Sequence, residues 1–161
     1  MLDPLLNLIF PVDCVLCKGR VTQWRSGAVC RSCEALLLTQ EPPFCEKCGL
    51  PAPAIEGLCE RCLTRRTRYD FGRAALVFDD ALRQLVHHCK YNDRVSLARP
   101  FSRALRNCLE RYGFVADSVV PVPLHWKQER HRGYNQAELL ASRLDLPLKR
   151  NIVRRRRETE S

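Results

Sequence analysis

Eight of the ten cysteines in this 161-residue chain stand in four Cys-x-x-Cys pairs near the N-terminus. Two cysteines three positions apart can both face one metal ion when the backbone between them turns tightly. Two such pairs supply the four thiolates of a closed tetrahedral zinc site. The spacing therefore predicts two zinc sites, whose ligands are Cys14, Cys17, Cys30, Cys33, Cys45, Cys48, Cys59 and Cys62.

The four pairs form a duplicated unit of roughly thirty residues. A glycine closely follows the first pair of each half (Gly19 and Gly49), and another lies in each spacer (Gly27 and Gly57). Glycine after such a turn relieves the backbone and lets N–H groups approach the thiolate sulfurs. The simplest assignment joins consecutive pairs around one ion, although a cross-braced arrangement satisfies the same spacing. Disulfides and an iron–sulfur cluster are the alternatives to zinc.

Zinc held by four thiolates has no open coordination position, so the predicted ions are structural. Metal binding would supply folding free energy that a segment with little apolar core lacks. The remaining cysteines, Cys89 and Cys108, fall on the apolar faces of predicted helices. We expect them to be buried core thiols rather than nucleophiles.

Positive charge predominates, with 27 Lys and Arg against 18 Asp and Glu, a formal net charge of +9. An excess of this size favours polyanionic partners such as nucleic acid, nucleotide phosphates or an acidic membrane surface, and a merely solvated basic surface is the alternative. No apolar run approaches the roughly 18 residues of a membrane span. Residues 1–11 lack the features of a secretory signal and are predicted to form a packing helix. We expect a cytoplasmic protein with reduced cysteines.

After residue 67 the sequence alternates between strand and helix patterns. Residues 73–79 and 117–123 are predicted strands, and the second has the unalternated, β-branched character of a parallel sheet covered on both faces. Apolar residues recur with a helical period in 80–90 and again in 97–112. Gly113 is expected to end the second helix. The pattern predicts an α/β fold.

A strand–loop–helix junction covers residues 119–140. Two prolines end the strand, and Asn135 with Glu138 three positions later predicts the capped start of a helix that runs to about Asp145. Ligands of open α/β sheets lie at such junctions, where a helix N-terminus favours anions. We infer a phosphate or pyrophosphate site, with an ordinary solvated turn as the alternative. Its proposed residues are Lys127, Arg130, Arg132, Gly133 for close backbone approach, and Trp126 for stacking.

The C-terminal segment is strongly basic and contains Lys149, Arg150 and the run Arg154, Arg155, Arg156 and Arg157. Together with the basic loop it could form one surface that binds phosphate backbones with strong salt dependence. Trp126 and Tyr134 could stack on bases, as the aromatic side chains of single-strand binders do. A disordered basic tail with non-specific affinity for polyanions is the alternative.

These segments together resemble the ComF family of competence and DNA-utilisation proteins. The resemblance rests on the two cysteine tetrads, Lys90-Tyr91, the Val-Pro-Val-Pro stretch at 120–123, the Arg-Gly-Tyr-Asn-Gln stretch at 132–136, and the basic run from 154. It covers nearly the whole chain. It implies an N-terminal helix and double zinc ribbon in residues 1–66, followed in 67–161 by the first part of a parallel-sheet domain like that of type I phosphoribosyltransferases.

The resemblance also implies ligands. The loop from Leu124 to Asn135 would correspond to the pyrophosphate-side loop of these transferases. The loop and the motif that ends it add Tyr134, Asn135 and Gln136 to the expected substrate-binding residues. It implies recognition of phosphoribosyl pyrophosphate, with magnesium when that ligand binds a full-length relative. It further implies a role in DNA uptake, with single-stranded DNA or DNA-uptake proteins as partners.

One family motif is missing from the sequence. The phosphate loop of the family has two acidic residues followed shortly by Thr-Thr-Gly, whereas Asp79-Asp80 is followed by Ala-Leu-Arg. We therefore expect a C-terminally truncated chain that does not catalyse transfer, because half a site cannot position two substrates. The alternative function is a non-enzymatic zinc-ribbon adaptor that binds nucleic acid or a protein partner.

Overall fold

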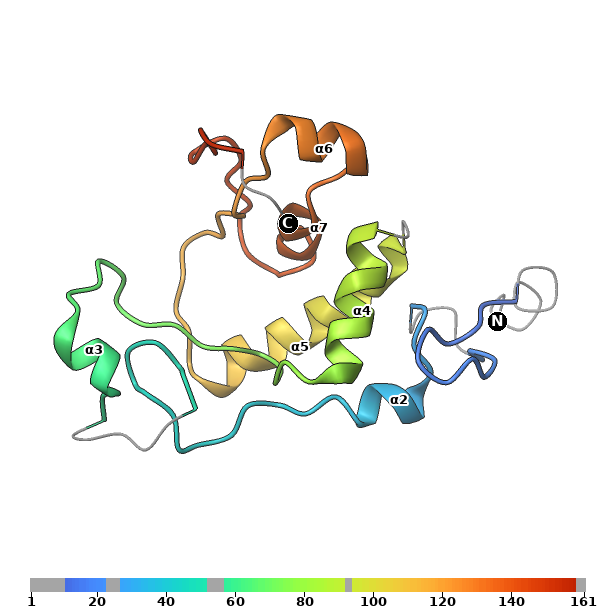
Figure 1. Cartoon of the computed structure of the whole chain (residues 1–161), viewed down its shortest axis with the longest axis horizontal. Coiled ribbons are helices and arrows are strands. Elements are labelled where there is room, and N and C mark those ends of the chain that lie inside the picture. Colours follow the sequence, from blue (N-terminus) through green and yellow to red (C-terminus); the bar gives the residue numbers. More distant parts are fainter. Residues whose placement is uncertain (1–10, 23–26, 52–56, 92–93, 159–161) are drawn as a thin grey trace.

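The computed structural model describes residues 11–22, 27–51, 57–91 and 94–158, so the helix predicted for residues 1–11 lies almost entirely outside the described residues. Figure 1 shows the arrangement of the elements. The helices are α2 (Arg31–Ala35), α3 (Glu60–Thr64), α4 (Asp80–Tyr91), α5 (Ala98–Arg111), α6 (Trp126–Arg132) and α7 (Gln136–Ala141), and a 3₁₀ turn, η2 (Val95–Leu97), leads into α5. No helix in these ranges combines the length and the apolar content that a membrane span requires.

Helices α4 and α5 confirm the helical periods read from the sequence. Helix α4 begins where the carboxylate of Asp79 accepts a hydrogen bond of 2.8 Å from the N–H of Leu82, a capping role that satisfies a free backbone donor. The helix buries Leu82, Leu85 and Cys89. Helix α5 ends at Arg111 with Tyr112 as its C-cap, and Gly113 follows with a positive φ of 61°, as predicted for a helix stop.

An apolar core joins the first cysteine unit to these helices. Its buried members from the N-terminal unit are Cys14, Val15, Val21, Ala28, Val29 and Cys33, and its members from α4, η2 and α5 are Leu82, Leu85, Cys89, Leu97 and Phe101. Leu85 and Leu97 are fully buried in this core. The core therefore extends across the predicted boundary between residues 66 and 67.

In the described residues, the predicted parallel sheet is represented by one short pairing. Val119 forms an isolated parallel bridge with Leu148, in which the Val119 N–H donates to Pro147 at 2.9 Å and the Lys149 N–H donates to Val119 at 3.0 Å. Residues 73–79 do not form the expected strand. A strand needs a neighbour along its length, and here the linker between the cysteine units supplies one hydrogen bond of 2.8 Å, from the N–H of Val77 to Leu38.

The linker between the two cysteine units runs beside α5, which places the units at opposite ends of the helical part (Figure 1). Tyr112 donates its hydroxyl to the carbonyl of Gln40 at 3.0 Å, and Arg111 pairs with Glu41 at 2.6 Å. The first turn of the second cysteine unit is joined to the segment that follows the unit. The N–H of Gly72 donates to the carbonyl of Lys47 at 2.7 Å.

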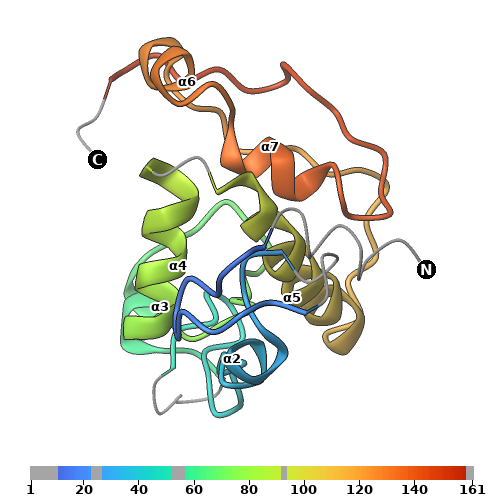
Figure 2. The same ribbon diagram turned by 90° about the vertical axis from the view of Figure 1, so that its right-hand side faces the viewer.

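Helix α7 packs on α5, whereas α6 lies at the end of the molecule away from α2 and α3 in both views (Figures 1 and 2). The hydroxyl of Ser102 on α5 donates to Leu140 of α7 at 3.2 Å. Tyr134, between α6 and α7, donates its hydroxyl to the carbonyl of Cys89 near the end of α4. These contacts fix the segment that contains the predicted phosphate site.

Candidate metal centres and basic surface

The structure gathers the eight paired cysteines into two separate groups. In each group all four sulfur atoms lie within 4.8 Å of one another. The first group is Cys14, Cys17, Cys30 and Cys33, and the second is Cys45, Cys48, Cys59 and Cys62. Consecutive pairs thus come together, and the cross-braced alternative does not occur.

The first pair of each group lies on a tight turn. The N–H of Lys18 donates to Cys14 at 2.9 Å, and the N–H of Gly49 donates to Cys45 at 2.8 Å. The fourth residue after the first cysteine has positive φ in both turns, 62° at Lys18 and 71° at Gly49. The expectation that Gly19 relieves the first turn is therefore wrong. Gly19 instead brings its N–H to 3.4 Å from the sulfur of Cys17.

The second pair of each group lies at the start of a short helix. Cys30 precedes α2 and Cys59 precedes α3, and both have the same extended backbone, with ψ of 158°. The second cysteine of each pair, Cys33 or Cys62, follows within the helix. The turn-then-helix order recurs in both halves, so the duplication seen in the sequence is also structural.

The sulfur positions fit a tetrahedral zinc ion. Zinc–sulfur bonds of about 2.3 Å at tetrahedral angles place two sulfurs about 3.8 Å apart. The distance between the sulfurs of Cys17 and Cys30 is 3.7 Å, and that between Cys48 and Cys59 is also 3.7 Å. With four soft ligands and no open position, both groups support structural zinc rather than a catalytic metal.

Backbone hydrogen bonds prepare one thiol in each group for ionisation. Burial alone would raise the pKa of Cys14, but N–H groups of Cys17, Cys30 and Leu16 point at its sulfur and lower the pKa to about 6. The pKa of Cys45 is likewise lowered to about 6, against the effect of burial, by backbone N–H groups that include those of Cys48 and Cys59. Such donors stabilise a thiolate and would orient it as a metal ligand.

The segment predicted as a basic loop is largely helical. Residues 126–132 form α6, and Gly133 ends that helix with a positive φ of 75°. The predicted cap of the next helix is confirmed, because the side chain of Asn135 accepts a hydrogen bond of 3.0 Å from the N–H of Ala137. The same side chain donates to Val122 at 3.1 Å. Asn135 is thus buried and engaged on both polar atoms.

The predicted site residues divide into two groups in space. Lys127 extends to Glu158 at 2.8 Å, so the C-terminal segment lies beside α6. Arg132 instead contacts α4 and α7. Its guanidinium lies 5.1 Å from the centre of the Tyr91 ring on α4 and donates a hydrogen bond of 3.4 Å to Gln136 of α7. Sequence reasoning had not assigned a role to Glu158.

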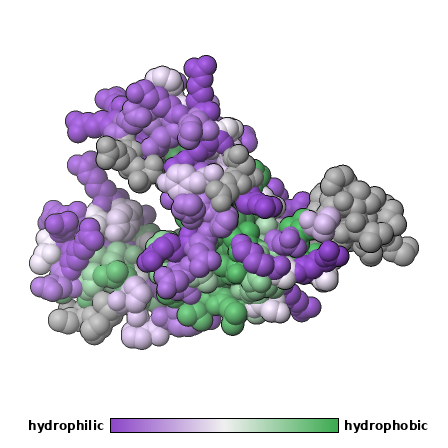
Figure 3. Space-filling view, turned by 45° about the vertical axis from the view of Figure 1, so that its right-hand side comes forward, coloured by the Kyte–Doolittle hydropathy of each residue, from purple (hydrophilic) through white to green (hydrophobic). Residues whose placement is uncertain are grey.

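Lys127, Arg130 and the run from Arg154 to Arg157 make up what we term the α6 surface. Trp126 is 62% exposed next to Lys127, whose amino group lies 5.9 Å from the centre of the indole ring. Lys127 and Arg130 are also exposed. Hydrophilic residues cover this upper part of the molecule in Figure 3. The structure thus places Glu158, which follows the arginine run, beside α6.

Comparison with known proteins agrees with this description. The double zinc ribbon domain family matches residues 5–63. Competence protein ComFC of Bacillus subtilis is 27% identical over 95% of this chain and 70% of its own length. Competence protein F of Haemophilus influenzae is 26% identical over 93% of this chain and 68% of its own length. DNA utilization protein YhgH of Escherichia coli is 31% identical over 85% of this chain and 62% of its own length.

These matches support the ComF family, which the cysteine tetrads and the motifs around residues 120–136 predicted. Alignment with these ComF relatives spans between 62% and 70% of their lengths. No solved structure gives a significant match.

Proposed function

We propose that this ComF-like protein acts in DNA uptake or utilisation, and that its α6 surface binds a phosphate-bearing ligand, either single-stranded DNA or phosphoribosyl pyrophosphate. The names of the relatives, two competence proteins and a DNA utilization protein, support the biological role. The observation that carries the binding site is the 2.8 Å ion pair between Lys127 and Glu158, which shows that the residue after the arginine run lies beside α6.

The α6 surface has the composition that phosphate backbones require. Exposed lysine and arginine side chains neutralise phosphates with little dependence on sequence, and binding then falls steeply with salt. The exposed indole of Trp126 could stack on a base, which contributes affinity without demanding one particular base. Both properties suit a protein that handles DNA of arbitrary sequence.

The test for single-stranded DNA is fluorescence anisotropy of a labelled oligothymidylate across a series of salt concentrations. Lys127→Gln with Arg130→Gln should weaken binding and lower the slope of log affinity against log salt by about 1.4, since two phosphate contacts are lost. The matched control is Arg68→Gln with Arg83→Gln, which removes two exposed charges outside the α6 surface. Equal losses in both variants would reduce the effect to net charge and reject this site.

Substitution of Glu158 offers a second test, in which the affinity for oligothymidylate should rise rather than fall. Its carboxylate accepts a hydrogen bond from Lys127, which lowers the pKa of Glu158 below its usual range and keeps it charged at neutral pH. An incoming phosphate must compete with this carboxylate for Lys127. Glu158→Gln should therefore raise the affinity for oligothymidylate. No change would show that Lys127 does not contact the ligand, and a decrease would show that the ion pair is needed to position the arginine run.

Calorimetry with phosphoribosyl pyrophosphate and magnesium separates the two proposed ligands. Heat from wild-type protein that is lost in Lys127→Gln with Arg130→Gln would identify phosphoribosyl pyrophosphate as a ligand. We do not propose phosphoribosyl transfer by this chain, because an acidic pair followed by Thr-Thr-Gly does not occur in its sequence. No heat, together with salt-sensitive binding of oligothymidylate, would favour a non-enzymatic DNA-binding role.

A zinc-ribbon adaptor is the second candidate function. A cavity of about 770 Å³ lies between the second cysteine unit and residues 65–78. Leu50, Tyr69 and Phe78 line it and are each at least 47% exposed, so apolar surface is available there for a partner. Failure of the α6 surface to bind either phosphate ligand, with retention of both zinc ions, would favour this alternative.

A further inference from the structure

A second concentration of arginines lies on α5, apart from the α6 surface. Arg99, Arg103 and Arg106 are spaced by four and then three residues, which places them on one face of the helix. They share a pocket of about 330 Å³ with Arg143, which follows α7, and with Ser102. Four of the five lining residues are therefore arginines, and we call this the α5 arginine pocket.

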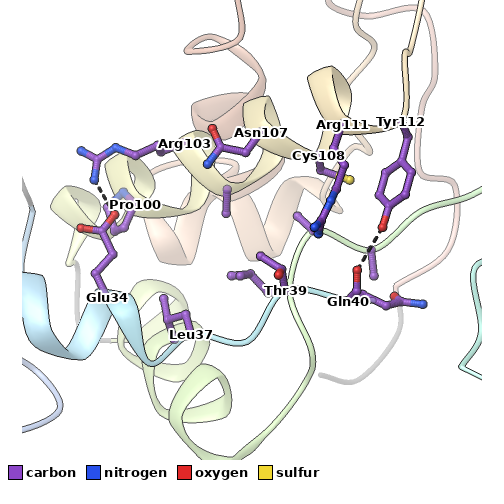
Figure 4. Close-up of a pocket in the computed structure, with 14 residues that line it drawn as sticks. Glu34, Leu37, Thr39, Gln40, Pro100, Arg103, Asn107, Cys108, Arg111 and Tyr112 are labelled. Carbon is purple, nitrogen blue, oxygen red and sulfur yellow. Dashed lines mark hydrogen bonds and ion pairs between the residues drawn. The ribbon is translucent and has the colours of Figure 1, made fainter. Parts of the chain in front are cut away.

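Two of these guanidinium groups contact other groups of the protein. Arg106 pairs with Asp145 at 3.2 Å and donates a hydrogen bond of 2.7 Å to the carbonyl of Arg143. Arg103 extends across to Glu34 of α2, as Figure 4 shows from the neighbouring cavity between α5 and the linker.

One residue of the pocket has a polar atom without a hydrogen-bond partner. The Nε of Arg143 is buried and has no hydrogen-bond partner in the described part of the chain. Arg103 pairs with Glu34, and Arg106 pairs with Asp145. Both ion pairs are solvent-exposed at one or both partners and are therefore weak enough to rearrange around a ligand.

Planar guanidinium groups bind phosphate through pairs of parallel hydrogen bonds, and several around one pocket favour a doubly charged tetrahedral anion. We propose that the α5 arginine pocket binds the phosphate group of a nucleotide or of a DNA backbone. This inference goes beyond the proposed function, because the pocket shares no residue with the α6 surface. Both sources present the same phosphate chemistry, and the experiment below separates them.

The probe is thymidine 5′-monophosphate, titrated into the full zinc-loaded chain by calorimetry at low salt. Arg99→Gln with Arg143→Gln should weaken binding about tenfold or more, because charge-assisted hydrogen bonds are lost. Arg143→Lys keeps the charge but not the paired hydrogen bonds, and should weaken binding less. The matched control, Arg68→Gln with Arg83→Gln, should bind as wild type does, and circular dichroism of each variant checks that the helices remain.

The Lys127→Gln/Arg130→Gln variant distinguishes this inference from the proposed function, because it should leave nucleotide binding unchanged. In that variant, an oligothymidylate without terminal phosphates is added as a competitor. Displacement of the nucleotide would identify a backbone phosphate as the ligand, and no displacement would identify a terminal phosphate. No binding by wild type, or equal binding by wild type and the well-folded Arg99→Gln/Arg143→Gln variant, would overturn the inference.

Discussion

At the scale of single residues, Gly27 of the first cysteine unit (the first ribbon) packs closely against η2 and the start of α5. Its φ is 77°, and a Cβ there would lie 2.5 Å from the carbonyl oxygen of Ser96 and 3.1 Å from Pro100. Gly27→Ala should lower the free energy of unfolding by about 2–5 kcal/mol, from backbone strain together with the clash. Urea titration of the zinc-loaded protein would measure the loss.

Gly113→Ala is the control for this prediction. Gly113 also has positive φ, 61°, but a Cβ there would meet nothing within 4 Å. Its substitution should therefore cost only the backbone strain, about 1–2 kcal/mol. Equal losses at the two glycines would show that the contact of Gly27 with Ser96 and Pro100 is not tight.

The two unpaired thiols allow a second prediction at this scale. Cys89 and Cys108 are buried, and burial raises the pKa of each thiol. The thiolate is the form that alkylates, so both should react on the order of tenfold more slowly with iodoacetamide in the folded protein than in urea. Peptide mass spectrometry can follow each site. Fast labelling of Cys108 in the folded protein would contradict its assignment as a core thiol.

The raised pKa values of Cys89 and Cys108 predict how the stability of the fold changes with pH. Because each folded-state pKa lies above that of the unfolded chain, the unfolded chain loses its thiol protons first as the pH rises. The stabilisation that comes from keeping these thiols protonated is complete below the unfolded pKa and is lost at alkaline pH. Stability should therefore decline as the pH rises past the ordinary range of a cysteine.

At the scale of elements, Arg73 connects the second ribbon to α5. Its guanidinium lies 4.9 Å from the ring centre of Phe44 and 5.5 Å from that of Tyr112, and it donates a hydrogen bond of 2.7 Å to the carbonyl of Glu46. Arg73→Gln should lower the free energy of unfolding by about 2–3 kcal/mol, because cation–π contacts and a charged hydrogen bond are lost.

Thermal denaturation with a zinc-sensitive dye would test the role of Arg73. The variant should release zinc from the second site at a lower temperature than wild type, while the first site is less affected. Arg83→Gln is a suitable control, because Arg83 pairs with Asp80 in an exposed i, i+3 salt bridge. Simultaneous early release from both sites would mean that Arg73 supports the whole fold rather than the second ribbon.

Sequence alone could identify the elements whose signal is local. The Cys-x-x-Cys spacing predicted both metal centres, and apolar periodicity predicted α4 and α5. Helix α6 was missed because Trp126–Arg132 has no apolar stripe, although Lys, Gln, Glu and Arg favour helices. The sequence prediction gave Gly19 the role of relieving the first turn, whereas in the structure the residue with positive φ in that turn is Lys18. The positions of Glu158 and Arg143 depend on contacts between segments distant in sequence.

At the scale of the whole molecule, the two ribbons are joined to the rest of the chain in different ways. Cys14 and Cys33 of the first ribbon belong to the same core as Leu85 and Leu97. The buried cysteines of the second ribbon, Cys45 and Cys59, lie outside that core. Zinc in the first site should therefore stabilise the helices directly, whereas zinc in the second site stabilises a peripheral unit. This coupling could not be read from the sequence, where the two units look equivalent.

Two double variants separate these roles. Cys14→Ser with Cys17→Ser should remove the first zinc, expose the apolar faces of α4 and α5, and abolish the cooperative thermal transition in circular dichroism. Cys45→Ser with Cys48→Ser should remove the second zinc but keep a cooperative transition at a lower temperature. Metal analysis should find one zinc per chain in each variant against two in wild type. If both variants show the same thermal transition, the first cysteine unit and the helices do not share a core. The shared core is the reason to expect different effects from losing the two zinc ions.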